Sequence, residues 1–207
     1  MIMNNREKVI QNAFDLFMTK GGTSLSLNDI LKELNMTKGG FYYYFKSRDE
    51  LIEEIIQRYM LDILWRPLRY IKENTDESMT AADRLRKYYC LLPNPVIFDC
   101  NGKIFKKYSI KSYLLMLYGL LEKHPNLGTA YKSFYEENIG LIAGVIKEGV
   151  EKGEIKNCIN PESYAEILIA IRDGIVGLSL IDDEINIDDK LEKSFDTAWK
   201  EICYEVL

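Results

Sequence analysis

The sequence predicts an all-α protein, with a small N-terminal three-helix domain joined by a long helix to a larger helical domain. Apolar residues recur at helical spacing in nearly every long segment, and no convincing alternating strand pattern appears. Glycine and proline number only 13 and 5 among 207 residues, which favours long elements with few breaks. A chain of this length, with 47% hydrophobic residues, can bury a sizeable core.

The first predicted helix covers residues 6–20. Gly21-Gly22 ends it, because glycine accepts the left-handed conformation that commonly terminates a helix. One face of this segment is apolar and predicts packing against the next helices. The residues of that face are Val9, Ile10, Ala13, Phe14, Leu16 and Phe17.

Two short helices follow and are separated by a tight turn. Ser26 is a good N-cap for the first, and Asp29 stands three residues later, close to a capping-box pattern. Asn35 is expected in a left-handed turn, which asparagine tolerates. Thr37 can cap the second short helix, over residues 38–45. Two short helices around a tight turn, supported on both sides, are the helix-turn-helix plan.

The segment Ser47-Arg48-Asp49-Glu50 has the S-x-x-E form of a capping box and opens a long helix. Pro67 is expected to end or kink that helix. We place the domain boundary between residues 46 and 47, giving a helix-turn-helix domain over 1–46 and a ligand-binding and dimerisation domain over 47–207. Further helices are predicted over residues 80–91, 106–123, 126–152, 161–181 and 188–206.

Composition excludes several classes of protein. The irregular spacing of Cys90, Cys100, Cys158 and Cys203 does not fit a disulfide framework, so free, mostly buried thiols are expected. His124 is the sole histidine, so no zinc site is expected, and its place before Pro125 predicts a surface loop. With no signal segment or membrane span, we expect a cytoplasmic protein without a cofactor.

Charge is distributed unevenly between the two predicted domains. Residues 1–50 hold seven lysines and arginines against six aspartates and glutamates, whereas the remainder holds 20 against 26. This asymmetry is modest, and it permits a DNA-binding domain on an acidic body.

Residues 37–48 have the chemistry of a DNA-recognition segment. Small residues at the start of a helix allow its backbone to approach a duplex, and cations and hydroxyls can then bind phosphate. Lys38 is the long donor at the helix start and the best candidate for a contact with a base edge. Two glycines in a helix each cost about 1 kcal/mol relative to alanine, and close approach to DNA is a reason for them. The candidate DNA-binding residues are Ser26, Thr37, Lys38, Gly39, Gly40, Tyr42, Tyr43, Tyr44, Lys46 and Arg48.

The stretch from Ser26 to Leu51 resembles the signature of the tetracycline-repressor (TetR) family, and the whole match spans about 45 residues at the N-terminus. That signature runs from a Thr-capped helix through a turn glycine to S/T-K-G-x-L-Y-x-H-F and x-S/T-K-x-x-L. In this sequence, Thr37-Lys38-Gly39 through Tyr42 and Phe45 preserve its spacing. The departures are Ser26, Leu31, Asn35, Tyr44 and Arg48, where the family usually has Thr, Ala, Gly, His and Lys.

The resemblance implies an all-α homodimer whose heads bind a palindromic operator and are released by a small-molecule effector. In that family the last two long helices usually form the dimer interface, which here are the segments near 161–181 and 188–206. The first is apolar on more than one face, which independently indicates burial by another surface. Within it, Arg172 and Asp173 are expected to pair between subunits, although a polar point in a ligand pocket is the alternative.

Aromatic and sulfur-bearing helices in the larger domain could line the effector pocket, although such stripes are more often simply core. The residues we select as pocket candidates are Tyr88, Tyr89, Tyr113, Met116 and Tyr135.

Two other classes of function compete with a ligand-responsive regulator. The first is a helical dimeric interaction protein that has lost specific DNA binding, and the retained Lys38, Tyr42, Lys46 and Arg48 argue against it. The second is a helical enzyme, which has no support because the sequence shows no nucleophile–base pair, phosphate loop or metal-ligand spacing. We therefore expect a non-enzymatic regulator.

Overall fold

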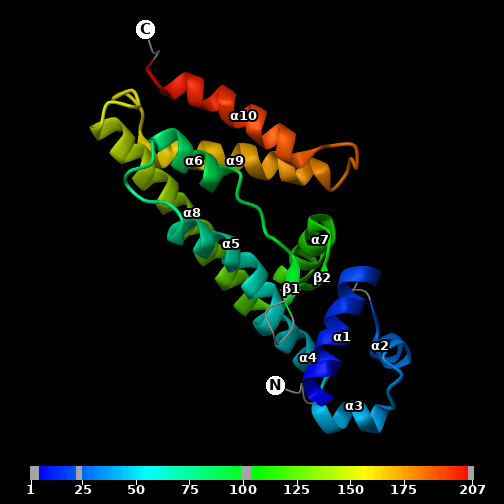
Figure 1. Cartoon of the computed structure of the whole chain (residues 1–207). Helices are drawn as coiled ribbons and strands as arrows, with labels where there is room; N and C mark the ends of the chain where they lie inside the picture. Colours follow the sequence, from blue (N-terminus) through cyan, green and yellow to red (C-terminus); the bar gives the residue numbers. More distant parts are fainter. Residues whose placement is uncertain (1–4, 22–24, 99–103, 205–207) are drawn as a thin grey trace. The chain divides into compact units, whose positions relative to one another are not determined.

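The computed structural model describes residues 5–21, 25–98 and 104–204. Helices form nearly all of the secondary structure of this part, and a single two-stranded sheet accompanies them (Figure 1). The chain divides into two compact units. Unit 1 comprises Met1–Trp65 and Pro93–Tyr131, and unit 2 comprises Arg66–Leu92 and Lys132–Leu207. The predicted all-α class is confirmed.

Unit 1 begins with three helices that share one apolar core. These are α1 (Asn5–Lys20), α2 (Leu27–Glu33) and α3 (Lys38–Tyr44), and α1 also packs against α4 (Arg48–Ile55). Each short helix is too short to be stable alone, so its apolar residues must be covered by neighbours. The largest buried side chains of this core are Phe14, Phe17, Ile30, Phe41, Phe45 and Leu51.

The long helix predicted after Ser47 is present, but it is not α-helical throughout. Between α4 and α5 (Leu61–Glu73) lies one π-helical turn, η1 (Ile56–Met60). The buried Tyr113 hydroxyl donates a hydrogen bond of 3.0 Å to the carbonyl oxygen of Met60, the last residue of that turn. Pro67 does not end the helix, because α5 continues through it to Glu73.

A β-hairpin replaces the start of the helix that the sequence predicted over 106–123. Strand β1 (Val96–Phe98) pairs antiparallel with β2 (Ile104–Lys107), and helix α7 (Ile110–Leu121) begins only after Ser109 caps it. The hairpin is tied to α1, because the Lys106 ammonium and the Tyr108 hydroxyl both donate to the Asp15 carboxylate. Burial raises the pKa of Tyr108, and its bond to Asp15 adds to that shift.

Unit 2 is built from the end of α5, α6 (Ala81–Tyr89), most of α8 (Pro125–Glu151), α9 (Pro161–Ser179) and α10 (Ile187–Ile202). Helices α9 and α10 pack side by side, and α6 contacts both (Figure 1).

Polar contacts fix the three helices α6, α9 and α10 to one another. The Tyr164 hydroxyl of α9 donates to the Ala198 carbonyl at 2.8 Å, and the Tyr89 hydroxyl of α6 lies 2.7 Å from Ser194 Oγ. Arg86 of α6 pairs with two carboxylates of α10 and covers the ring of Phe195. The packing of α10 against α6 is therefore partly electrostatic.

The cysteine and histidine predictions need correction. Cys158 is exposed and Cys90 and Cys203 are half-buried, so the expected burial of these free thiols is wrong, while Cys100 lies outside the described residues. His124 is 5% exposed rather than on a surface loop, because the turn that carries it packs against α4.

The described part of the chain has neither a cluster of metal-binding side chains nor a membrane-spanning helix. No group of His, Cys, Asp and Glu side chains there could hold a metal ion. None of the described helices is long and apolar enough to cross a membrane.

Candidate nucleic-acid interface

The position of helix α3 is set by two side-chain caps and one left-handed turn. Ser26 and Asp29 form a complete capping box at the start of α2, as the sequence predicted. Asn35 has φ of 50°, which confirms the predicted left-handed turn between the two helices. Thr37 Oγ1 then accepts a hydrogen bond of 3.0 Å from the Gly40 amide and starts α3. These contacts between residues close in the sequence set the direction in which the chain enters α3.

Two phenylalanines one helical turn apart, one in α3 and one at its C-cap, anchor the helix, and the tyrosines between them are more exposed. Phe41 and Phe45 are almost wholly buried and their ring centroids lie 5.3 Å apart. Tyr42 and Tyr43 between them are 55% and 82% exposed. Two exposed tyrosines on so short a helix leave large apolar rings in water, which is unfavourable unless another surface covers them. Tyr44 is half-buried.

The two glycines of α3 differ in what surrounds them. A Cβ added to Gly39 would meet no other atom within 4 Å, so no packing inside the protein requires glycine there. A Cβ at Gly40 would lie 3.2 Å from Thr37 Oγ1, the atom that caps the helix. Gly40 therefore protects the cap, whereas Gly39 keeps the outer surface of α3 flat.

Exposed donors flank the same surface. The side chains of Thr37, Lys38 and Lys46 are exposed.

At the start of α4, Ser47 Oγ accepts from the Glu50 amide at 3.1 Å, while Glu50 Oε2 accepts from the Lys46 amide at 2.6 Å. The predicted capping box is therefore present in a variant form, in which the glutamate returns to the residue before the N-cap. This arrangement holds the backbone that joins α3 to α4.

Arg48 and Ser26 each form hydrogen bonds within the protein, so both have a structural role. The Arg48 Nε–H donates to the Leu25 carbonyl oxygen at 2.9 Å, and its side chain is 26% exposed. The Ser26 hydroxyl is bonded to Asp29 within the capping box. Both residues fix the start of α2 and thereby position the interface.

An ion pair that the sequence analysis missed joins α1 to α4. Arg6 Nη2 donates to Glu54 Oε1 at 2.8 Å, and the Arg6 guanidinium also lies over the Phe45 ring. The bond to Arg6 lowers the pKa of Glu54 to about 2, with a second contribution from Arg58. No sequence signal identified this pair, because its members lie 48 residues apart.

The predicted pocket residues fall in different units. Tyr113 and Met116 belong to unit 1, where Tyr113 is fully buried and Met116 lines a cavity of about 190 Å³. Tyr88, Tyr89 and Tyr135 belong to unit 2, where the first two are buried. Their assignment to one effector pocket stays a prediction.

Unit 2 contains buried polar atoms that lack a partner, and sequence reasoning missed the clearest of them. Asn138 on α8 is fully buried, and neither its amide oxygen nor its amide nitrogen is hydrogen-bonded within the described structure. The Nη1 of Arg172 and the Nε of Arg84 are also buried without a partner. Arg172 is 5% exposed and pairs with Asp173 of its own helix, and the expected pairing between subunits stays a prediction.

The fold and this surface define a helix-turn-helix DNA-binding protein, because a capped short helix presents glycine, lysine and tyrosine outward from a rigid three-helix core. Residues 9–55 match the family model described as bacterial regulatory proteins, tetR family. The N-terminal segment of the chain therefore resembles the DNA-binding domain of this family of regulators.

Similar proteins cover most of the chain. The uncharacterized HTH-type transcriptional regulator YwcC of Bacillus subtilis is 25% identical, over 84% of this chain and 76% of its own. The HTH-type transcriptional repressor DhaR of a Mycobacterium species is 23% identical, over 83% and 80%. A transcriptional regulator from Saccharomonospora viridis, solved in complex with choline, shares the fold with a TM-score of 0.68 and 20% identity, covering 97% and 98% of the two chains.

Proposed function

We propose that the protein is a ligand-responsive repressor that binds a palindromic operator as a homodimer and is released by a small-molecule effector. In this proposal residues 1–46 read DNA, and residues 47–207 dimerise and bind the effector. The observation that carries the DNA-binding part is the outer surface of α3, where Gly39 faces open space and Tyr42 and Tyr43 are exposed. The relative DhaR is named a repressor, which favours repression over activation.

The exposed surface of α9 supports a dimer through α9 and α10. Three large aliphatic side chains on this helix, and a fourth in the turn that follows it, are exposed although the helix is otherwise packed into unit 2. They are Ile167, Ile171, Leu178 and Ile181, and with Gly174 they follow a 4-3-4-3 spacing. Apolar residues at this spacing form the seam along which two helices pack. An apolar stripe of this kind is unfavourable in water, and a second copy of the helix would cover it.

The interior of unit 2 supports effector binding. Buried polar groups are nearly always hydrogen-bonded, and each one left unpaired costs about 1–3 kcal/mol. Asn138 offers one donor group and one acceptor without partners, and Arg172 offers a cationic donor. A polar small molecule would satisfy such atoms. The fold can hold one, since the S. viridis regulator binds choline.

The mechanism we infer is a change of spacing between two recognition helices. In a dimer that represses, the two α3 helices would enter successive major grooves about 34–36 Å apart. An effector that favours another spacing would weaken operator binding through a coupling of about 1–3 kcal/mol. The coupling is reciprocal, so operator DNA would weaken effector binding by the same factor.

The proposal is tested by binding of the purified protein to DNA upstream of its own gene and neighbouring genes, over a salt series. We expect a tight, sequence-dependent complex that Lys38→Ala and Tyr42→Phe weaken. Lys107→Ala is the matched control, because Lys107 is an exposed lysine on β2, outside the predicted interface. Binding that ignores sequence and is equally affected by all three changes would favour an interaction protein that has lost specific recognition.

The effector part needs a separate measurement on the same complex. A small-molecule library is screened for release of the operator, and each hit is then tested for binding to the DNA-free dimer. If every compound that binds unit 2 leaves operator affinity unchanged, release by an effector is wrong even though DNA binding stands.

A further inference from the structure

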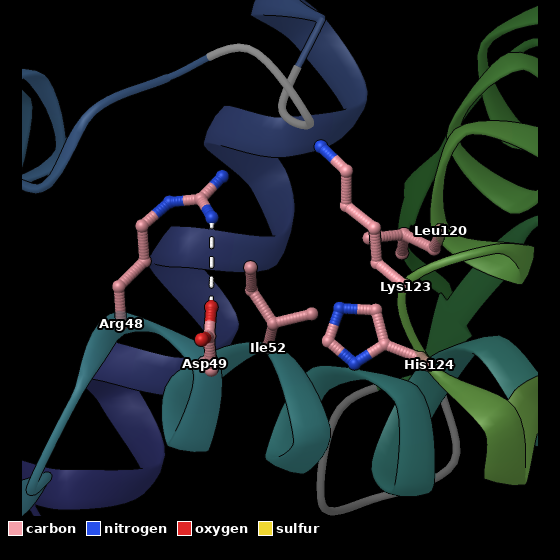
Figure 2. A pocket seen from close by; sticks show the side chains of 6 residues that line it. All are labelled: Arg48, Asp49, Ile52, Leu120, Lys123 and His124. Atoms are coloured by element: carbon pink, nitrogen blue, oxygen red, sulfur yellow. Dashed lines mark ion pairs between the residues drawn. The ribbon is translucent and has the colours of Figure 1, made fainter.

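A second cavity lies within unit 1, beside the helix that follows the recognition helix. It has a volume of about 300 Å³, and Arg48, Asp49, Ile52, Leu120, Lys123 and His124 line it (Figure 2). The first three residues belong to the first turns of α4, and the other three to the end of α7 and the turn before α8. All six lie in unit 1, so the cavity is formed inside one compact body.

Cationic side chains approach this cavity from two sides. Figure 2 shows Arg48 on one side and Lys123 on the other, with Ile52 between them. No described residue forms an ion pair or hydrogen bond with the Lys123 ammonium, so this charge is available to a ligand. Arg48 already donates its Nε–H to the Leu25 carbonyl oxygen at 2.9 Å and contacts Asp49 at 3.8 Å, and these contacts hold its guanidinium beside the cavity. A guanidinium has five N–H donors, so it can bind an anion in addition to such partners.

The inner wall of the cavity combines a held imidazole with apolar side chains. His124 is 5% exposed, and its Nδ1 lies 2.6 Å from Glu53 Oε1, which accepts the hydrogen bond. Glu53 therefore fixes the ring and leaves Nε2 as its second polar atom. Ile52 and Leu120 are almost wholly buried and form the apolar part of the wall.

We propose that this cavity binds a small anion with a carboxylate or phosphate head, held between Arg48 and Lys123 and against His124. The apolar wall would accommodate a short hydrocarbon attached to that head. Such a ligand would join the α7–α8 turn to the first turn of α4, because its partners come from both. This site is distinct from the effector pocket proposed for unit 2, and its existence does not depend on that pocket.

The sole histidine of the chain provides a direct probe of the site. Full-length protein without an affinity tag, labelled with ¹³C-histidine, gives imidazole signals from His124 alone. Titration with inorganic phosphate and, separately, with sodium butyrate should shift these signals saturably, at constant ionic strength and pH. Lys123→Gln should weaken the binding roughly tenfold, the loss expected for one charge-assisted contact. Lys107→Gln removes the same charge at an exposed position away from the cavity and should leave the titration unchanged.

Two results would overturn the proposal. The first is that neither anion shifts the His124 signals saturably, and the second is that both lysine variants respond as the wild type does. The titration needs no DNA, so it can fail while operator binding stands, or succeed while operator binding fails.

A third measurement distinguishes a free anion from a phosphate of the DNA backbone, since both have the same chemistry. If a DNA phosphate is the natural occupant, Lys123→Gln lowers affinity for DNA, reduces its salt dependence by about one phosphate contact, and inorganic phosphate competes with DNA. If a free anion is the occupant, Lys123→Gln leaves DNA affinity unchanged while weakening binding of the anion about tenfold.

Discussion

Units 1 and 2 differ in how their buried polar groups are bonded and in which kind of hydrophobic side chain they expose. In unit 1 the buried His124 is bonded to Glu53, and the exposed rings on α3 are tyrosines with a polar tip. In unit 2 the buried Asn138 has no hydrogen-bond partner among the described residues, and the large hydrophobic side chains that α9 exposes are aliphatic.

Under the proposed function, this difference means that unit 2 is the part that would gain from a second protomer and a ligand. The buried imidazole of unit 1 has its partner within the same unit, and the tyrosines of α3 carry hydroxyls that can bind a hydrated polyanion such as DNA. A unit with unpaired polar atoms inside and an aliphatic stripe outside gains stability from further partners.

The aliphatic stripe of α9 should be the most sensitive feature. Leu178→Asp places a charge on both sides of a symmetric contact, and we expect dimer affinity to fall by about 3 kcal/mol or more, over a hundredfold. Sedimentation velocity over a concentration series measures this. Leu115→Asp is the control, because Leu115 is 53% exposed on α7 and Leu178 is 58% exposed on α9. Equal oligomeric states for the two variants would show that the stripe is not the interface.

Substitution on the outer surface of α3 should have the second-largest effect. Lys38→Ala should weaken operator binding by about 1–3 kcal/mol and relax sequence preference at the base pairs it contacts. Fluorescence anisotropy with the operator and single-base variants measures both effects. If affinity falls by the same amount for every sequence, Lys38 contacts phosphate rather than a base edge.

The contribution of the Arg6–Glu54 ion pair to the stability of unit 1 can be tested through its dependence on pH. The pKa of Glu54 is about 2 in the folded protein, against an ordinary value of 4.5, so this group stabilises the folded state above pH 4.5 and loses that contribution as pH falls toward 2. Arg6→Met should lower stability by roughly 1–3 kcal/mol at pH 7 and by much less at pH 3. Urea unfolding at both pH values measures the difference. A loss of the same size at both would mean that Arg6 acts through its packing on Phe45 alone.

The Asn138 amide, which has no hydrogen-bond partner among the described residues of unit 2, predicts a substitution that stabilises the folded protein. Asn138→Leu replaces a buried amide by an apolar side chain of similar size, and we expect the ligand-free protein to gain about 1–3 kcal/mol. Thermal unfolding measures it. Ser179→Ala serves as the comparison, because the buried Ser179 hydroxyl already donates to the Val176 carbonyl and its removal offers no such gain. A destabilised Asn138→Leu variant would show that the amide is already satisfied.

The smallest effect concerns Gly39. Because its Cβ would face open space, Gly39→Ala should stabilise α3 by up to about 1 kcal/mol while weakening operator binding. Gly140→Ala on α8 is the matched control, since a Cβ there also meets no atom within 4 Å, and it should stabilise the fold without affecting DNA binding. Unchanged DNA affinity in Gly39→Ala would remove close approach as the reason for this glycine.

Much of the interface was predictable from sequence because local contacts decide it. The capping box of Ser26, the left-handed Asn35 and the Thr37 cap each depend on side chains within four residues of the backbone they hold. The hairpin of β1 and β2 was missed, although an Asn-Gly dipeptide between two apolar runs is a strong hairpin signal. Lys106 and the α7 segment were assigned to one helix because their apolar spacing permits either element over a short run.

The sequence by itself determined the helical class, the caps and turn that orient α3, and the identity of the residues around it, because these depend on neighbours along the chain. Only the tertiary structure decided that His124 is buried against Glu53, that Arg6 joins Glu54, and that Asn138 lacks a partner. Such contacts join residues many positions apart, or depend on what packs around a buried group, and helical periodicity specifies the buried face of a helix but not the atoms that meet there.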